Sequence, residues 1–253
     1  MNRLIAAALM LVCAAALPAA ARAQKARVEL DHVFIVVTPG GTAEIAALRA
    51  AGLTVVAEPM KHDGQGTASV AAYFDNGYLE LIWVDSTVAI DADHASTAQW
   101  FRQASAWRAN GHSPFGLGLH RLPGDTLPLP VTVKREPAPW LPAGNAYELL
   151  HQPGDSLASD FFVVPAVTAV PSWVARARQR KPELWQHAGG GGAITLLRVY
   201  GPPAHEPLAF QLLRPHPVEM VRAEDPLLEI HINRGVRNQR VDLRPVLPLV
   251  LVR

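Results

Sequence analysis

The sequence predicts an α+β fold built from repeated units of strands with short helices. Three observations predict it. Residues 28–84 alternate strand-like and helix-like segments in the order βαβββ. Residues 115–165 contain four more strand-like runs, separated by proline and glycine turns. The 22 prolines of the chain suit short strands and many turns, which favours this architecture over a doubly wound parallel sheet.

Residues 1–23 are predicted to be a secretory signal peptide. MNR supplies a positive end, LIAAALMLVCAAALPAA an apolar run, and ARA a small-x-small cleavage site before Gln24. An uncleaved membrane anchor is the alternative, but the run is short, rich in alanine and followed by a cleavage site. We therefore expect a periplasmic or secreted protein. The mature chain would lack the only cysteine, Cys13, which suits an oxidising compartment.

The first unit, residues 28–84, begins with the strand-like LDHVFIVV and ends with the strand-like YLELIWV. Between them, alanine-rich residues 42–52 predict one short helix that ends at a glycine. A second strand is expected at residues 53–59, a glycine-rich loop at 61–67 and a third strand at 68–74. The following DNG sequence predicts a tight hairpin turn into the last strand.

Two potential metal ligands lie inside apolar strands, one at each end of this unit. Side chains alternate along a strand, so His32 and Phe34 share one face of the first strand, and Tyr78 and Glu80 share one face of the last. An ionised carboxylate on a buried strand face is costly unless something compensates its charge. A cation bound between His32 and Glu80 would compensate it.

The segments DHVFIVV, the helix, the HDGQGT loop and FDNGYLEL, in this order, resemble the first module of the vicinal-oxygen-chelate (VOC) superfamily, and more narrowly its glyoxalase-like branch. The resemblance implies paired βαβββ modules that form a cupped mixed sheet, the glyoxalase/bleomycin-resistance/dioxygenase-like fold. It also implies that His32 and Glu80 occupy two ligand positions for one divalent metal ion, such as Zn, Mn, Ni or Fe.

A segment at residues 85–111 is predicted to become a helix that bridges the modules, with His94 exposed to solvent in its polar lead-in. Residues 115–165 then mirror the first module without its helix. If modules pair as the resemblance implies, this second stretch closes the cup opposite residues 28–84, with Phe161 and Phe162 lining or plugging it.

The second stretch departs from the metal-binding pattern. Aligning FGLGL with VFIVV places Pro114 opposite His32, where a ligand is wanted. A catalytic metal ion commonly takes three or four protein ligands and keeps one position open. His112 and His120 are therefore candidates for a third ligand, with His62 or a water molecule as further alternatives.

The loop HDGQGT supplies polar groups at the rim of the expected cup. Its glycines permit close backbone approach, and His62, Gln65 and Thr67 offer hydrogen-bond donors and acceptors. No lysine follows and no helix begins there, so it is not a phosphate loop. His62 is an acid–base candidate; the alternative is a loop ordered by its own hydrogen bonds.

Residues 183–253 indicate a third, partial module. The LLEIHIN sequence resembles the strand around Glu80, so His187 and Glu229 would mark its first and last strands, with His231 on the same face as Glu229. The alternative is that Glu229 and His231 face solvent on an edge strand. The apolar, proline-containing tail predicts a final edge strand.

Charge and motifs narrow the function. With 23 Lys and Arg against 22 Asp and Glu, the chain has no basic stripe to neutralise phosphates, so we expect no nucleic-acid partner. We expect a small-molecule ligand and no stable membrane association after leader cleavage; a homodimer stays open. Gly-x-Ser-x-Gly, HExxH and CxxC motifs do not occur.

The sequence therefore predicts an exported glyoxalase-like protein that acts on a small organic molecule in a cupped sheet. As an enzyme it would use a divalent metal at His32 and Glu80, with His62 and Glu80 as catalytic residues, in lyase-, isomerase- or dioxygenase-type chemistry. One alternative is a metal-free protein that sequesters a hydrophobic compound; another is that His32 and Glu80 hydrogen-bond each other in a packed core. The expected aromatic lining is Phe34, Tyr73, Trp83, Phe161 and Phe162.

Overall fold

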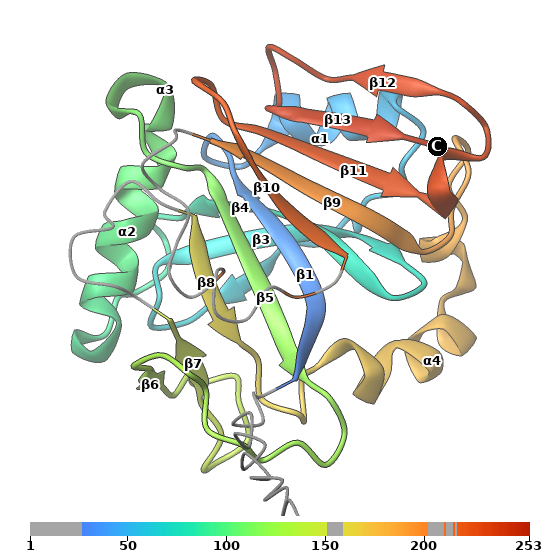
Figure 1. Cartoon of the computed structure of the whole chain (residues 1–253). Helices are drawn as coiled ribbons and strands as arrows, with labels where there is room; N and C mark the ends of the chain where they lie inside the picture. Colours follow the sequence, from blue (N-terminus) through green and yellow to red (C-terminus); the bar gives the residue numbers. More distant parts are fainter. Residues whose placement is uncertain (1–26, 151–158, 202–209, 211–214, 216) are drawn as a thin grey trace, which may run out of the picture.

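The computed structural model describes residues 27–150, 159–201, 210, 215 and 217–253, which form two β-sheets with flanking helices (Figure 1). The predicted signal peptide and its cleavage site lie outside these residues. Among the described helices, none has the length and apolar character needed to cross a bilayer.

The larger sheet has eight strands in the order β2-β3-β4-β1-β5-β8-β7-β6. Each half has the same pattern. β1 pairs in parallel with β4 and β5 in parallel with β8, while β1 and β5 meet antiparallel at the centre. This curled mixed sheet confirms the predicted α+β fold with paired modules. Its strands are β1 (Val28–Val36), β2 (Met60–His62), β3 (Thr67–Phe74), β4 (Gly77–Val84), β5 (Phe115–Arg121), β6 (Lys134–Glu136), β7 (Tyr147–Leu149) and β8 (Asp160–Val163).

The expected helices form close to their predicted bounds. The first helix ends at Ala50, and Gly52 follows its cap with a φ of 81°, the left-handed conformation that a glycine adopts without strain. Trp173 belongs to the last α-helix, which has a proline in its first turn. The α-helices are α1 (Thr42–Ala50), α2 (Ala95–Ser105), α3 (Trp107–Asn110) and α4 (Val170–Arg180), and the short 3₁₀ helices are η1 (Ala92–His94), η2 (Pro182–Trp185) and η3 (Asn233–Gly235).

The second strand of the first module is displaced from its expected position. Residues 53–59 are not a strand, although Val56 donates a backbone hydrogen bond to Ala71 at 2.9 Å. Strand β2 begins instead at Met60 and overlaps the start of the segment expected to be a glycine-rich loop. Gly64 and Gly66 have positive φ angles and return the chain sharply, so the residues just before them pair with β3. His62 is therefore at a strand end, opposite Thr67.

The C-terminal segment forms a second sheet of five strands in the order β10-β9-β11-β13-β12. The tail supplies edge strand β12 and interior strand β13, which pairs in parallel with β11. The segment is therefore a separate sheet, and its tail ends in an interior strand where an edge strand was expected. Its strands are β9 (Ile194–Gly201), β10 (Val218–Arg222), β11 (Leu227–Ile232), β12 (Arg240–Asp242) and β13 (Leu249–Val252).

His187 does not begin a strand, contrary to the third-module prediction. It precedes β9, and its ring joins two parts of the first module: Nδ1 accepts the backbone N–H of Thr54 at 2.9 Å, and Nε2 donates to the Tyr73 carbonyl at 2.8 Å. Glu229 and His231 do share a face of β11, with a 2.7 Å contact between their side chains.

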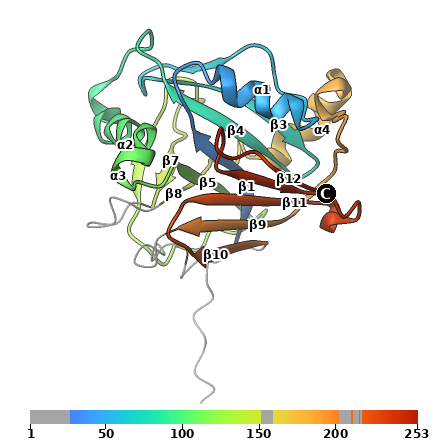
Figure 2. The same ribbon diagram turned by 90° about the horizontal axis from the view of Figure 1, so that it is seen from above.

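The eight-stranded sheet is buried on both faces. One face packs against α1 and the five-stranded sheet, which lie together over it in Figure 2, and the core there includes Leu79, Leu117 and Leu228. The concave face packs against α2, with Phe34 and Phe101 in contact. Because side chains alternate along each strand, each strand residue faces either the core or the concave side.

Candidate functional site

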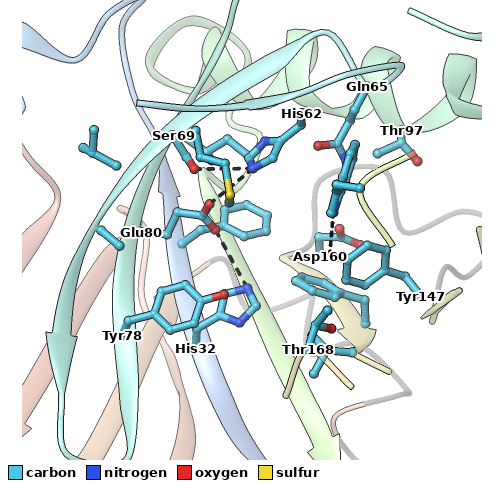
Figure 3. Close-up of a pocket in the computed structure, with 18 of the residues that line it drawn as sticks. His32, His62, Gln65, Ser69, Tyr78, Glu80, Thr97, Tyr147, Asp160 and Thr168 are labelled. Carbon is cyan, nitrogen blue, oxygen red and sulfur yellow. Dashed lines mark hydrogen bonds and ion pairs between the residues drawn. The ribbon is translucent and has the colours of Figure 1, made fainter. Parts of the chain in front are cut away.

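A cavity of about 420 Å³ lies on the concave face, between the two halves of the large sheet and helices α2 and α4 (Figure 3). It is within the size range of small-molecule sites. All three residues predicted to carry chemistry line it: His32, His62 and Glu80. Four of the residues predicted to bind a ligand line it as well, namely Phe34, Gln65, Tyr73 and Phe162.

Three residues predicted to line the cup lie elsewhere. Trp83 and Phe161 are buried in the core on the opposite face, because Trp83 is an odd number of residues from Glu80 and Phe161 is next to Phe162. Thr67 is fully buried behind His62 and supports that ring. The alternation that placed Glu80 correctly also excludes Trp83 and Phe161 from the cavity.

His32 and Glu80 are brought together as predicted. Strands β1 and β4 are paired with Phe34 opposite Glu80, which places both ionisable side chains on the concave face. Their Nε2 and Oε2 atoms are 3.8 Å apart, and both residues are more than nine-tenths buried. That distance is too long for a direct hydrogen bond, so the pair is not a packed, hydrogen-bonded couple.

Asp31, which the sequence reasoning missed, orients His32. A register shift in the pairing of β1 with β5 occurs at Asp31, whose carboxylate contacts His32 Nδ1 at 2.9 Å and accepts the Val170 backbone N–H at 2.6 Å. Burial raises the pKa of Asp31, but the contacts with His120, His32 and Val170 outweigh it and lower the pKa to about 2. Asp31 is therefore ionised, and His32 Nδ1–H donates to it. The Asp-His dipeptide was the available signal.

His62 is oriented in the same way by a neutral partner. Thr67 Oγ1 donates its one hydrogen to Gln65 at 2.8 Å, so it accepts from His62 Nδ1–H at 2.9 Å. Burial lowers the pKa of His62, assisted by the charge of His32 and opposed by the charges of Glu80 and Asp63. A neutral His62 with hydrogen on Nδ1 presents the lone pair of Nε2, which faces Glu80 Oε1 at 3.9 Å.

Three groups therefore converge: the Glu80 carboxylate and the Nε2 atoms of His32 and His62, each of which is an acceptor when its ring carries hydrogen on Nδ1 alone. We call these three groups the acceptor cluster. The Ser69 hydroxyl also lies 3.5 Å from His62 Nε2. Among the described residues, the Glu80 carboxylate accepts no hydrogen bond, and its distances of 3.8 and 3.9 Å to the two imidazoles are too long for one. A buried carboxylate in this condition needs a cation or a hydrogen-bond donor to compensate it.

The two other predicted metal ligands do not reach this cluster. His112 contacts the Ser113 carbonyl through Nδ1 at 2.9 Å, and His120 lies 3.4 Å from Asp31; neither lines the cavity. Both predictions are wrong in placement, because His112 precedes β5 and His120 lies at its far end. Within the described part of the chain, no three His, Cys, Asp or Glu side chains are grouped closely enough to hold a metal ion.

A second polar group lies at the other wall of the cavity. Glu136 of β6 accepts hydrogen bonds from Thr97 at 2.8 and 3.0 Å and contacts Lys134 at 3.1 Å. His94 lies 3.9 Å from Glu136 and is almost fully buried, contrary to the expectation that it is exposed. The short strand β6 gave no sequence signal for this group, because its position depends on how the two halves curl together.

Aromatic rings form much of the remaining wall. Tyr78 stacks on His32 with ring centres 4.4 Å apart. Burial, followed by the charge of Glu80, raises the pKa of Tyr78 well above its usual value, and burial raises the pKa of Tyr147 to about 12. Both phenols are therefore neutral. The aromatic side chains that line the cavity are Phe34, Tyr73, Tyr78, Phe101, Trp140, Tyr147, Phe162 and Trp173.

Comparisons with known proteins agree with this fold. Residues 30–122 match the family model described as a glyoxalase-like domain, which confirms the predicted resemblance for the first module and the start of the second. No curated protein matches the chain. A crystal structure of a hypothetical protein from Staphylococcus aureus is similar in fold, with 9% identity and a TM-score of 0.50 over 88% of this chain and 98% of that one.

Proposed function

We propose that this protein binds a small organic molecule in the cavity, with a polar group of the ligand against the acceptor cluster, and that Glu80 acts on it as a general base in glyoxalase-like chemistry. One observation carries the proposal. The buried Glu80 carboxylate has no hydrogen bond among the described residues and opens onto a cavity of ligand size. Such a carboxylate is poised to accept a proton from a bound molecule.

The neighbouring residues support this role for Glu80. Asp31 and Thr67 hold the Nδ1 side of the two imidazoles, which fixes their Nε2 atoms toward Glu80. Tyr78 and Phe162 cover the His32 ring from two directions and keep it from turning. A general base must be held within hydrogen-bond reach of its target, and these contacts provide that rigidity.

A divalent metal ion is the proposed cofactor; the donor set fits one in ligand type, although among the described residues the side chains are not grouped closely enough to hold it without moving. His32 and Glu80 would hold it, with His62 as the neighbouring imidazole, and Asp31 is the kind of carboxylate that commonly orients a metal-binding histidine. A bound cation would polarise a ligand oxygen as a Lewis acid.

Glu80→Gln tests the proposal, because it keeps the shape and removes the charge. In excess chelator we expect the variant to melt at or above the temperature of the parent, since it no longer has an uncompensated buried carboxylate. A library of small organic molecules is screened by thermal shift, with and without Zn, Mn, Ni or Fe. Molecules and metals that stabilise the parent should lose this effect in Glu80→Gln and keep it in the exposed control Glu224→Gln.

If no molecule and no metal stabilises the parent, the proposal is wrong. A second candidate function, metal-free sequestration of a hydrophobic compound, is favoured by the aromatic wall. It predicts that the stabilising molecules still bind Glu80→Gln and leave the parent protein chemically unchanged.

We also propose that the protein is exported, on the basis of the leader-like sequence of residues 1–23. Intact-mass measurement of the exported protein should give a chain that begins at Gln24. A mass that includes residues 1–23 would contradict cleavage.

A further inference from the structure

The hydroxyl group of Tyr147 is a polar group of the cavity that the proposed function leaves unused. Tyr147 lies on β7 and lines the cavity, where Figure 3 shows it on the side opposite Glu80. The indole Nε1–H of Trp140 donates to the Tyr147 oxygen at 3.1 Å. An indole N–H can only donate, so the phenol oxygen is the acceptor in this bond, and the hydroxyl hydrogen is left for another partner.

No described part of the protein takes up this hydrogen. Among the described residues, the Tyr147 hydroxyl makes no hydrogen bond besides the one from Trp140. Burial raises the pKa of Tyr147 to about 12, so the phenol keeps its hydrogen throughout the physiological pH range. The hydroxyl can therefore donate to a molecule that occupies the cavity.

Aromatic contacts fix the position of this donor. The Tyr147 ring meets the edge of Phe162 with ring centres 5.9 Å apart and lies 6.4 Å from the Trp140 ring. The Trp140 ring in turn contacts the rings of His62 and His94, with ring centres 5.3 and 6.4 Å away. A donor held in this way loses little freedom when a ligand binds, which favours affinity and selectivity.

Two other phenols line the cavity, and their hydroxyl groups are not directed in this way. Neither Tyr73 nor Tyr78 has a hydroxyl hydrogen bond to another described residue, so each hydroxyl can turn to donate or to accept. The Tyr147 oxygen already accepts the Trp140 N–H, so Tyr147 faces a ligand as a donor. It therefore selects for an acceptor on the ligand.

We infer that Tyr147 is a specificity-determining residue whose O–H donates to a carbonyl oxygen of the bound molecule, across the cavity from Glu80, and that Trp140 is the positioning residue that holds it. The inference rests on the proposed function and names its substrate class, an aromatic or apolar carbonyl compound. A carbonyl oxygen accepts without donating and carries no net charge. An anionic oxygen would bring a second negative charge near Glu80, whose charge already contributes to the raised pKa of Tyr147.

The probe is 2-acetylnaphthalene labelled with ¹³C at its carbonyl, and 2-isopropenylnaphthalene, which has CH₂ in place of the oxygen, is its matched control ligand. Calorimetry and ¹³C NMR are done on the full chain at pH 7.5 in excess chelator, so that no metal ion polarises the carbonyl. A hydrogen bond to the oxygen moves the carbonyl carbon signal downfield of its position in an apolar solvent. We expect this downfield signal in the parent.

Tyr147→Phe keeps the ring and removes the donor. The carbonyl signal should move upfield, and the affinity for the ketone should fall about three- to tenfold, the effect of one neutral hydrogen bond, while the affinity for the alkene stays the same. Tyr200→Phe, on β9 of the other sheet, is the control and should behave as the parent. A parent signal at the apolar-solvent position, or a signal that Tyr147→Phe leaves unchanged, would overturn the inference.

Two further variants test the geometry. Trp140→Phe removes the indole donor, so the phenol is held less firmly and the carbonyl signal should lie between those of the parent and Tyr147→Phe. Glu80→Gln should leave the signal downfield, because the oxygen faces the opposite wall. If Glu80→Gln moves the signal as far as Tyr147→Phe does, the oxygen lies at the acceptor cluster and the inference is wrong.

Failure of this inference is distinguishable from failure of the proposed function. If the ketone does not bind the parent while the library screen finds molecules whose binding depends on Glu80, the carbonyl class is wrong and the proposed function stands. If neither the ketone nor any library molecule binds, both fail.

Discussion

The two halves of the large sheet share a topology and differ in chemistry. Strands β1 to β4 supply the whole acceptor cluster, whereas the central strand of the second half has glycine where the first half has ring side chains. A Cβ atom at Gly118 would lie 2.6 Å from His32 Nδ1, and one at Gly116 would lie 2.7 Å from Phe34 Cε2. The second half is thus a flat platform on which the rings of the first half rest.

Within the second half, the two faces of strand β8 also differ in what they contact. Phe161 is buried in the core with Phe210, whereas Phe162 faces the cavity and contacts His32 and Tyr147. One strand therefore stabilises the sheet with one face and closes the ligand site with the other.

The largest predicted effect separates these two phenylalanines. Phe161→Ala should lower the free energy of unfolding by about 3–5 kcal/mol, because it leaves a cavity in a closed core. Phe162→Ala should cost less, since its ring already borders open volume, and should weaken ligand binding more. Urea unfolding of both variants checks this, and equal losses of stability would show that the two faces are not distinct.

The next effect concerns the platform. Gly118→Ala should lower stability by up to about 3 kcal/mol, because the added methyl group collides with the His32 ring, whose other side is covered by Tyr78. Ligand binding should weaken with it. The exposed Gly124→Ala is unsuitable as a control because its φ is 77°, so Gly201→Ala, with open space around it, is the matched control. A Gly118→Ala protein with parent stability would contradict the platform.

A smaller effect concerns Asp31. Its pKa is about 2 in the folded protein and 3.8 ordinarily, so its ionised form contributes about 2 kcal/mol of stability above pH 3.8. This contribution is lost as the pH falls from about 4 through 2. Asp31→Asn should lose it at pH 7 and show a flatter decline of stability in acid. Unfolding experiments from pH 2 to 7 give the free energy of unfolding of parent and variant at each pH. If this free energy changes with pH in the same way in both proteins, this role for Asp31 is ruled out.

The sequence predicted the placement of His32 and Glu80 because that placement follows from the pattern of the first module alone. His32 and Glu80 lie on strands joined by a short unit, and strand alternation sufficed to place both on one face. The position of strand β2 was harder to predict from the sequence. The turn at Gly64 and Gly66 sets this position, and apolar alternation does not. The fold class followed from the pattern of elements, and the family match over residues 30–122 agrees with it.

The parts that the sequence did not predict depend on contacts between distant elements. Glu136 reaches the cavity only because β6 lies close to α2, where Thr97 donates to it. Asp31 accepts the Val170 N–H only because α4 begins beside β1. His94 becomes buried by the same closure. No periodicity within a single segment encodes such contacts.

The central claim is that the lone pairs of His32 and His62 converge on Glu80. Long-range ¹H–¹⁵N correlation spectra of protein with labelled histidine report directly which ring nitrogen carries hydrogen. At pH 7.5 in chelator and without ligand, we predict that both rings carry hydrogen on Nδ1 and none on Nε2, with assignments made from His32→Gln and His62→Gln. If either ring carries its hydrogen on Nε2, that ring donates toward Glu80, and the acceptor cluster does not exist as described.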